Sequence, residues 1–297
     1  MQAKSQSGLS PARRISSLLF AKPKLRLALL LAAPLTWLVL IYIVALVALL
    51  ITAFWSVDTF TGEIQMTWSL DNIQSVFTQA LYRTVTFRTL GIAILVTIVD
   101  ILIALPIAFY MAKVASKSLQ RVLVIMILMP LWASYLVKAY AWRSVLSHDG
   151  ILQWILHPFG VATPGYGLTG VIITQAYLWL PYVILPIYTG LEKVPNSLLE
   201  ASGDLGANAV KTLRFVVLPM LVPSIVAASI FSFSLTLGDY ITVNIVGGAN
   251  QMLGNLVYTN VGAANNLPLA SAIALIPVLL MFLYLTAVRK TGALENL

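Results

Sequence analysis

The stretch Leu27–Val57 reads LALLLAAPLTWLVLIYIVALVALLITAFWSV and contains no charged side chain. A helix that crosses the hydrocarbon core of a membrane needs about 20 mostly apolar residues, so this stretch predicts a transmembrane helix within 27–57, spanning the membrane near 27–54. The run is too long for the core of a signal peptide and has no obvious small-residue cleavage site. We therefore expect a retained span, preceded by a basic cytoplasmic segment, 1–26.

Five further apolar segments repeat this pattern along the chain. We expect them near 86–112, 120–146, 168–190, 214–238 and 267–288. Asp100 lies deep within the first of these five, and Lys138 and Arg143 lie in the last part of the second. Hydrophobic residues make up 60% of the 297 positions and charged residues only 9%, whereas soluble domains carry roughly 25% charged residues. The sequence therefore predicts an all-α integral membrane protein with six transmembrane helices.

The basic residues predict the orientation of the chain in the membrane. Lysine and arginine are enriched in cytoplasmic loops, and fourteen of the 18 fall on that side if the N-terminus is inside. We therefore expect both termini in the cytoplasm, with a tail at 291–297. The net charge of +8 does not indicate nucleic-acid binding, because the basic residues recur at the ends of apolar runs. The outer connections, near 55–85, 147–167 and 239–266, are predicted to be irregular.

One internal loop, between the fourth and fifth predicted spans, carries a specific pattern. Ser197 followed three residues later by Glu200 predicts a capping box at the start of a short helix. Gly206 is expected to supply the left-handed or tight backbone at the end of that helix. Asn208 is expected to cap a second helix that continues into the fifth span. The loop 191–213 is therefore predicted to form a helix, a turn and another helix.

This loop resembles the signature of ABC-importer permeases, which is Glu-Ala-Ala, three residues, Gly, nine residues, Ile, one residue and Leu-Pro. The matching positions here are Glu200, Ala201, Ser202, Gly206, Val216, Leu218 and Pro219. Ser202 replaces the second alanine and Val216 replaces the isoleucine, and both changes are conservative. The similarity extends over roughly 80–290. It implies a type I ABC-importer permease domain over 80–290, whose loop, with Asp204, forms a cytoplasmic coupling helix that docks on an ATPase subunit.

Within this family the chain is most similar to spermidine/putrescine-type permeases, in the stretches 130–135, 180–186, 237–240 and 247–248. The resemblance implies a permease in the bacterial cytoplasmic (inner) membrane that imports a small organic cation. The implied partners are two cytosolic ATPase subunits, a second and homologous permease subunit, and an extracytoplasmic solute-binding protein. ATP and Mg²⁺ would bind to the ATPase subunits, and this chain would hold no cofactor. The alternatives are another solute of the same importer class (an amino acid derivative, a metal or an oxyanion) and an ion-coupled secondary carrier.

Acidic and aromatic side chains in or near the spans are candidates for contact with a cationic solute. Asp239 and Tyr240 lie at the outer end of the fifth span, where an aromatic face would attract a cation by about 0.5–2 kcal/mol. Asp100 lies where an ionisable group is costly and faces either the helix bundle or a water-filled path. Four aromatic residues of the third and fourth spans complete the set: Trp132, Tyr135, Trp179 and Tyr182. For each of these seven residues the alternative is a structural role in packing, hydrogen bonding or interfacial anchoring.

Several other motifs do not carry chemistry. Lys211-Thr212 is not the end of a phosphate-binding loop, because that motif needs glycine at the positions of Val210 and Leu205. His148 and His157 have no partners at metal-ligand spacing, so no metal site is predicted. No serine–histidine–acid or paired-carboxylate arrangement is discernible. The sequence therefore predicts a transport subunit without an ATP site of its own rather than a membrane enzyme.

Overall fold

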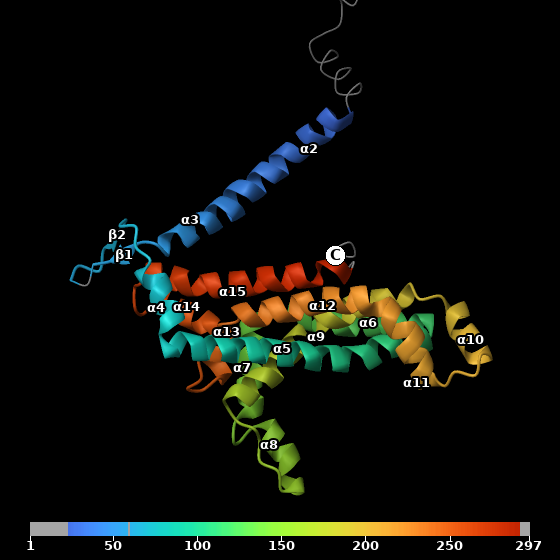
Figure 1. Cartoon of the computed structure of the whole chain (residues 1–297). Helices are drawn as coiled ribbons and strands as arrows, with labels where there is room; N and C mark the ends of the chain where they lie inside the picture. Colours follow the sequence, from blue (N-terminus) through green and yellow to red (C-terminus); the bar gives the residue numbers. More distant parts are fainter. Residues whose placement is uncertain (1–22, 59, 292–297) are drawn as a thin grey trace, which may run out of the picture. The chain divides into compact units, whose positions relative to one another are not determined.

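The structure is a computed structural model that describes residues 23–58 and 60–291. Most of the predicted N-terminal segment 1–26, and the predicted tail 291–297 beyond its first residue, lie outside the described residues. The chain divides into two compact units, residues 1–52 and 53–297. Helices and strands carry the labels of Figure 1.

The described part of the first unit is a continuous helical segment. It consists of α2 (Pro23–Leu38), the π-helical turn η1 (Val39–Val44) and α3 (Ala45–Thr52). The span Arg26–Thr52 carries apolar side chains on every face, and nearly all of them are exposed. A helix that is hydrophobic all round either is buried in a large core or spans a membrane. The predicted first span is therefore confirmed.

The second unit begins with a small hairpin and a short helix. These elements are β1 (Ser56–Val57), its antiparallel partner β2 (Ile64–Gln65) and α4 (Asp71–Thr78). In the hairpin turn, the backbone N–H groups of Thr61 and Phe60 donate to the Asp58 carboxylate at 3.0 and 2.8 Å. These bonds hold the pKa of that carboxyl below its ordinary value. The connection 55–85, predicted to be irregular, is thus partly ordered into regular elements.

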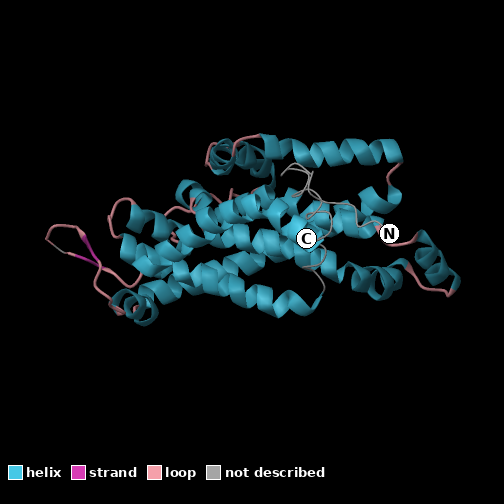
Figure 2. Ribbon diagram, turned by 90° about the horizontal axis from the view of Figure 1, so that it is seen from above, coloured by secondary structure: helices cyan, strands magenta, loops and turns pink. Residues whose placement is uncertain are grey.

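The second unit is built almost entirely of helices (Figure 2), and three long helices pack against one another in it (Figure 1): α5 (Ala80–Phe109), α9 (Leu168–Glu192) and α12 (Leu218–Gly238). On α5, the small side chains of Ala104 and Ala108 are fully buried in one core cluster with Ile187 of α9 and Leu221 of α12. Small residues let helices approach closely in a membrane, where packing rather than water exclusion drives helix association. This trio positions most of the candidate site residues.

The remaining elements of this unit are short helices and one further long helix, α15. They are η2 (Tyr110–Val114), α6 (Lys117–Trp132), α7 (Tyr135–Leu146), α8 (Ile151–Leu156), η3 (His157–Phe159), α10 (Asn196–Asp204), α11 (Ala209–Thr212), η4 (Leu213–Val217), α13 (Ile241–Val246), α14 (Leu253–Val261), α15 (Leu267–Val288) and η5 (Arg289–Thr291). The connections 147–167 and 239–266, predicted to be irregular, therefore contain α8, η3, α13 and α14. α14 packs along α15.

The third predicted span, 120–146, is not a single straight helix. α6 and the segment that begins with α7 meet at an angle of 94°. At the junction, Ala133 and Ser134 adopt extended backbone, with ψ of 141° and 138°. Pro130, just before them, lacks a backbone N–H and weakens the last turn of α6. The prediction of one unbroken helix is corrected to a bent pair.

Within the described residues, five helices are long and apolar enough to cross a membrane, and the bent pair gives a sixth span if it counts as one. The five are Arg26–Thr52, Ala80–Val114, Leu168–Glu192, Ala209–Gly238 and Leu267–Val288. Each contains most or all of a predicted apolar segment. The predicted all-α membrane architecture is confirmed.

Candidate functional site

A cavity of about 400 Å³ lies where α12 ends, on the side predicted to face outward. α12 stops at Gly238, Asp239 is extended with φ −74° and ψ 108°, and α13 starts at Ile241. The cavity, called the outer cavity below, is lined by Tyr135, Trp179, Ser234, Leu235, Gly238, Asp239, Tyr240 and Ile241. Four of the seven predicted solute-path residues are therefore brought together here from α7, α9 and the break between α12 and α13.

The Asp239 carboxylate in the wall of this cavity accepts hydrogen bonds from three donors. Tyr135 Oη donates to Oδ1 at 2.6 Å, and the backbone N–H of Thr242 donates to the same oxygen at 3.0 Å. Gln175 Nε2 donates to Oδ2 at 2.9 Å. Asp239 is only 7% exposed, and burying a carboxylate is costly unless such donors replace its water. All three donors are neutral, so they satisfy the carboxylate without cancelling its negative charge.

Two members of this network, Gln175 and Thr242, were missed by sequence reasoning. Both side chains are fully buried. Gln175 left a signal, because it is the only amide side chain between residues 168 and 190, and a lone amide in an apolar span needs a polar partner. Thr242 left none, since threonine is an ordinary residue at the end of a membrane helix.

Aromatic rings extend the wall of the outer cavity. Tyr135 and Trp179 stack with ring centroids 5.7 Å apart and an interplanar angle of 14°. Tyr182, three residues further along α9, has its ring centroid 6.4 Å from that of Trp179. Tyr240 stacks on Tyr258 of α14 at 4.7 Å. A negatively charged group beside several aromatic faces is a suitable environment for an organic cation.

Asp100 and Trp132 lie outside this lining. Asp100, on α5, is fully buried, and its Oδ2 accepts a hydrogen bond from Ser232 Oγ of α12 at 2.6 Å. Ser232 precedes Asp239 by seven residues, which is about 10 Å along a helix that rises 1.5 Å per residue. Trp132 ends α6 and is 87% exposed. The structure thus gives Asp100 a bond between two core helices rather than a place in the cavity wall.

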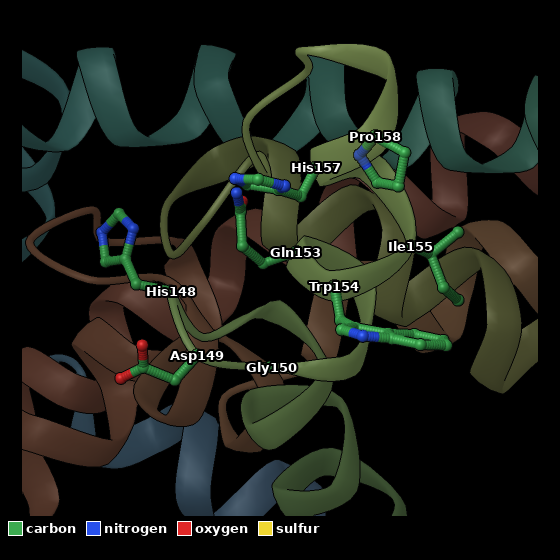
Figure 3. A pocket seen from close by; sticks show the side chains of 8 residues that line it. All are labelled: His148, Asp149, Gly150, Gln153, Trp154, Ile155, His157 and Pro158. Atoms are coloured by element: carbon green, nitrogen blue, oxygen red, sulfur yellow. The ribbon is translucent and has the colours of Figure 1, made fainter.

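A second cavity, of about 650 Å³, lies on α8 and the turns before and after it (Figure 3). It is lined by His148, Asp149, Gly150, Gln153, Trp154, Ile155, His157 and Pro158. Within the described residues, no group of three or more His, Cys, Asp or Glu side chains could hold a metal ion. None of the predicted solute-path residues reaches this cavity.

The internal loop forms the predicted helix, turn and second helix, and Figure 1 shows α10 at one end of the bundle, beyond α11. The predicted capping box, however, is wrong. α10 begins at Asn196, its N-cap position is Pro195, and no side chain caps it. Ser197 therefore lies inside the first turn. Pro195, with φ −66°, fixes the backbone at the start of the helix.

The turn after α10 depends on Gly206, whose φ is +75°, a conformation that costs residues with a Cβ about 1–2 kcal/mol. Beside it, the N–H of Ala207 donates to the carbonyl of Ser202 at 3.1 Å, which closes the helix end as a glycine C-cap does. Asn208 Oδ1 then accepts the N–H of Lys211 at 2.9 Å and caps α11. The predicted backbone roles of Gly206 and Asn208 are confirmed.

Of the other signature residues, one forms a hydrogen bond within the loop and several have side chains exposed on the surface. Ser202 Oγ lies 2.8 Å from Thr212 Oγ1, so the serine that replaces the family's alanine ties α10 to α11. Leu218 and Pro219 begin α12, where proline is well tolerated. Val216 is half-buried, whereas Glu200, Ala201 and Asp204 are exposed, as is Leu205 between Asp204 and Gly206, by 88%.

Lys113 ties the start of α10 to the end of α5. Its Nζ donates to the carbonyl of Val194 at 2.6 Å and to Asn196 Oδ1 at 3.1 Å. Lys113 lies in η2, the continuation of α5. α10 is therefore joined to a core helix at its beginning and, through Ser202, to α11 near its end. Lys113 is one of the fourteen basic residues that the sequence placed on the cytoplasmic side.

Most of the chain is similar in sequence to known proteins. Residues 94–290 match the family of binding-protein-dependent transport system inner membrane components. The inner membrane ABC transporter permease protein YdcU of Escherichia coli (strain K12) is 40% identical over 312 residues, covering 100% of this chain and 98% of that protein. The spermidine/putrescine transport system permease protein PotB of Haemophilus influenzae is 31% identical over 233 residues, covering 77% of this chain and 81% of that protein.

Solved structures share the fold. A chain of a bacterial alginate ABC transporter, crystallised with a periplasmic protein that holds an alginate pentasaccharide, has a TM-score of 0.70 at 14% identity and covers 92% of this chain and 97% of its own. A chain of the MetNI methionine ABC transporter in an inward-facing conformation has a TM-score of 0.56 at 19% identity, covering 71% of this chain and 94% of its own. At these identities the likeness concerns the fold alone.

Proposed function

The chain belongs to the family of binding-protein-dependent transport system inner membrane components, and from this premise we propose that it forms the translocation path for a small organic cation, most specifically a polyamine. It is a multi-pass permease subunit of an ABC importer in the inner membrane. Such permeases work with ATPase subunits, which hydrolyse the ATP, and with a solute-binding protein. The full assembly we propose has two ATPase subunits with bound ATP and Mg²⁺, and a second, homologous permease subunit.

The observation that carries the cation proposal is the buried Asp239 carboxylate in the wall of the outer cavity. Its three donors are neutral, and the rings of Tyr135, Trp179 and Tyr240 line the same space. An ammonium group would gain a charge-assisted hydrogen bond and contact with aromatic faces there. An anion would meet only repulsion from Asp239. Tyr182 extends this path along α9, whereas we assign Asp100 to the contact between α5 and α12.

The polyamine proposal rests on this chemistry together with relatives of the PotB type, whose name states spermidine and putrescine. The name of YdcU states no solute. The fold does not decide the solute, because a structural neighbour imports the acidic polysaccharide alginate. The evidence for a cationic solute that is specific to this chain is therefore the set of residues that line the outer cavity.

The loop 191–213 is the proposed contact with the ATPase subunits, on the cytoplasmic side. Two ties hold α10, one from Lys113 and one between Ser202 and Thr212. Its end exposes Leu205 by 88%, while Val210 and Phe215 beyond it are each 70% exposed. A helix held at both ends that presents apolar side chains can transmit force to a partner. Glu200, Ala201, Ser202 and Gly206 of the family signature lie on this segment.

Solute competition in vesicles tests the proposed function. We expect the complete transporter, with its binding protein outside and ATP inside, to take up labelled spermidine at a rate that needs ATP and falls with excess unlabelled putrescine. Excess maltose or succinate should leave the rate unchanged, because neither carries a cationic group that could meet Asp239. Uptake of a neutral or anionic solute in preference to both polyamines would contradict the cation proposal and leave the family assignment standing.

A further inference from the structure

One hydroxyl group in the outer cavity has two alternative hydrogen-bond acceptors. Tyr135 Oη lies 2.6 Å from Asp239 Oδ1 and also 2.6 Å from Thr242 Oγ1. With its proton directed at the carboxylate, it accepts the proton of Thr242. With its proton directed at Thr242, it releases the carboxylate and remains satisfied. The cost of an unpaired buried donor is therefore avoided in both arrangements.

Of the three donors to Asp239, only Tyr135 faces the cavity. Tyr135 is part of the lining, whereas Gln175 and Thr242 are fully buried behind it. A carboxylate offers about four lone-pair sites, and three of them are occupied here. A primary ammonium group, with three N–H donors, can take the free site on Oδ2. It reaches Oδ1 only by displacing the Tyr135 hydroxyl.

We infer that Tyr135 is a specificity-determining residue, a latch that a cationic solute must release to bond both carboxylate oxygens of Asp239. This inference rests on the proposed function, because it takes the solute to be a cation. A neutral donor would form with the carboxylate only the kind of hydrogen bond that the hydroxyl already makes, so it gains nothing by displacing it, whereas an ammonium group adds the attraction between opposite charges. The latch thus lets the cavity respond to positive charge, and Gln175 holds the carboxylate in place while the exchange occurs.

Release of the latch changes the connection between two elements. The bond from Tyr135 to Asp239 joins the first residue of α7 to the break between α12 and α13. α7 is the second arm of the bent pair, and it packs on α13. A ligand shifts a conformational equilibrium only by the difference in its affinity for the two states. A cation that replaces the hydroxyl supplies such a difference, because it binds best when this tie is broken.

The rate of ATP hydrolysis without solute or binding protein tests the latch. In the complete complex in vesicles, we expect Tyr135→Phe to raise this basal rate at least about threefold, because the tie is already lost. Tyr177→Phe is the matched control: it removes the same group from a ring of α9 that packs against Trp142 outside the outer cavity and has no hydrogen bond among the described residues, and its basal rate should equal that of the wild type. Phenylalanine at 135 keeps the stack on Trp179, so the complex should assemble.

A second variant, Thr242→Val, is expected to lower the stimulated rate of ATP hydrolysis. Thr242→Val removes the alternative acceptor and keeps the shape of the side chain, so a displaced Tyr135 hydroxyl would have no partner. Stimulation of ATP hydrolysis by the spermidine-loaded binding protein should then fall several-fold. Wild-type basal rates in Tyr135→Phe, or full stimulation in Thr242→Val, would overturn the latch. Stimulation of the wild-type complex only by anionic or neutral solutes would instead overturn the proposed function, and the basal rates would still report on the latch.

Discussion

Replacing Asp239 with asparagine is expected to slow polyamine uptake by roughly tenfold or more, with solute capture by the external binding protein unchanged. The amide keeps the shape of the side chain and one carbonyl oxygen for Tyr135 and Thr242. Gln175 can turn its amide, whose Oε1 has no hydrogen-bond partner among the described residues, to accept from the new NH₂ group. What is lost is the negative charge, and a hydrogen bond to a charged group contributes about 1.5–3 kcal/mol. Each 1.4 kcal/mol corresponds to a factor of ten.

Asp100→Asn is the matched control for this prediction. Asp100 is also a buried acid with a hydroxyl donor, Ser232, and the amide oxygen can accept that bond equally well. Because Asp100 does not line the outer cavity, its asparagine variant should take up polyamine at close to the wild-type rate. Initial rates of labelled spermidine uptake in vesicles measure both variants. Native uptake in Asp239→Asn, or an equal loss in the two variants, would leave the cation path without support.

Replacing Gly206 with valine is expected to lower uptake and stimulated ATP hydrolysis together, by roughly tenfold or more. A Cβ atom at this position would have no neighbouring atom within 4 Å. The effect of valine therefore comes from backbone strain rather than from a steric clash. The φ of +75° costs an L-residue about 1–2 kcal/mol, and a β-branched side chain resists it most. The turn that orients α10 should therefore be lost in most molecules, although the spans still insert.

Gly62→Val is the control for the effect of backbone strain at a positive φ outside the loop 191–213. Gly62 has a φ of +72° and equally open surroundings, but it lies in the hairpin between β1 and β2. The same substitution there should leave the ATPase subunits bound in a pull-down, whereas Gly206→Val should weaken their retention. Unchanged transport and ATP hydrolysis in Gly206→Val would show that the loop 191–213 does not couple the permease to its ATPases.

Features set by local physics were predictable from the sequence. Apolar length alone located the spans, because the membrane leaves no other way to satisfy the backbone of an uncharged stretch such as 27–57. Gly206 and Asn208 were assigned correctly because left-handed turns and helix caps depend on a few neighbouring residues. The start of α10 was misplaced for the same local reason: Pro195 fixes the backbone two residues earlier than the serine-based cap assumed.

Features that leave no mark in hydropathy, or that depend on distant contacts, were not predictable. The 94° bend between α6 and α7 leaves no mark in hydropathy, since both arms are apolar. Gln175 and Tyr135 are 64 and 104 residues from Asp239 in the sequence, so nothing local indicates that they meet. Asp100 and Asp239 looked alike as acids of the spans, and only packing places one against Ser232 and the other in the cavity wall.

Thiol labelling at Ser234 tests most directly whether the outer cavity is the path of an organic cation. The chain has no cysteine, so Ser234→Cys places a single, nearly isosteric thiol in the cavity lining. In the complete complex with binding protein present, we predict that a membrane-impermeant maleimide added outside reacts with this thiol and that spermidine slows the reaction several-fold. Maltose at the same concentration should not slow it. Labelling that is unaffected by spermidine, or that is slowed equally by maltose, would contradict the account.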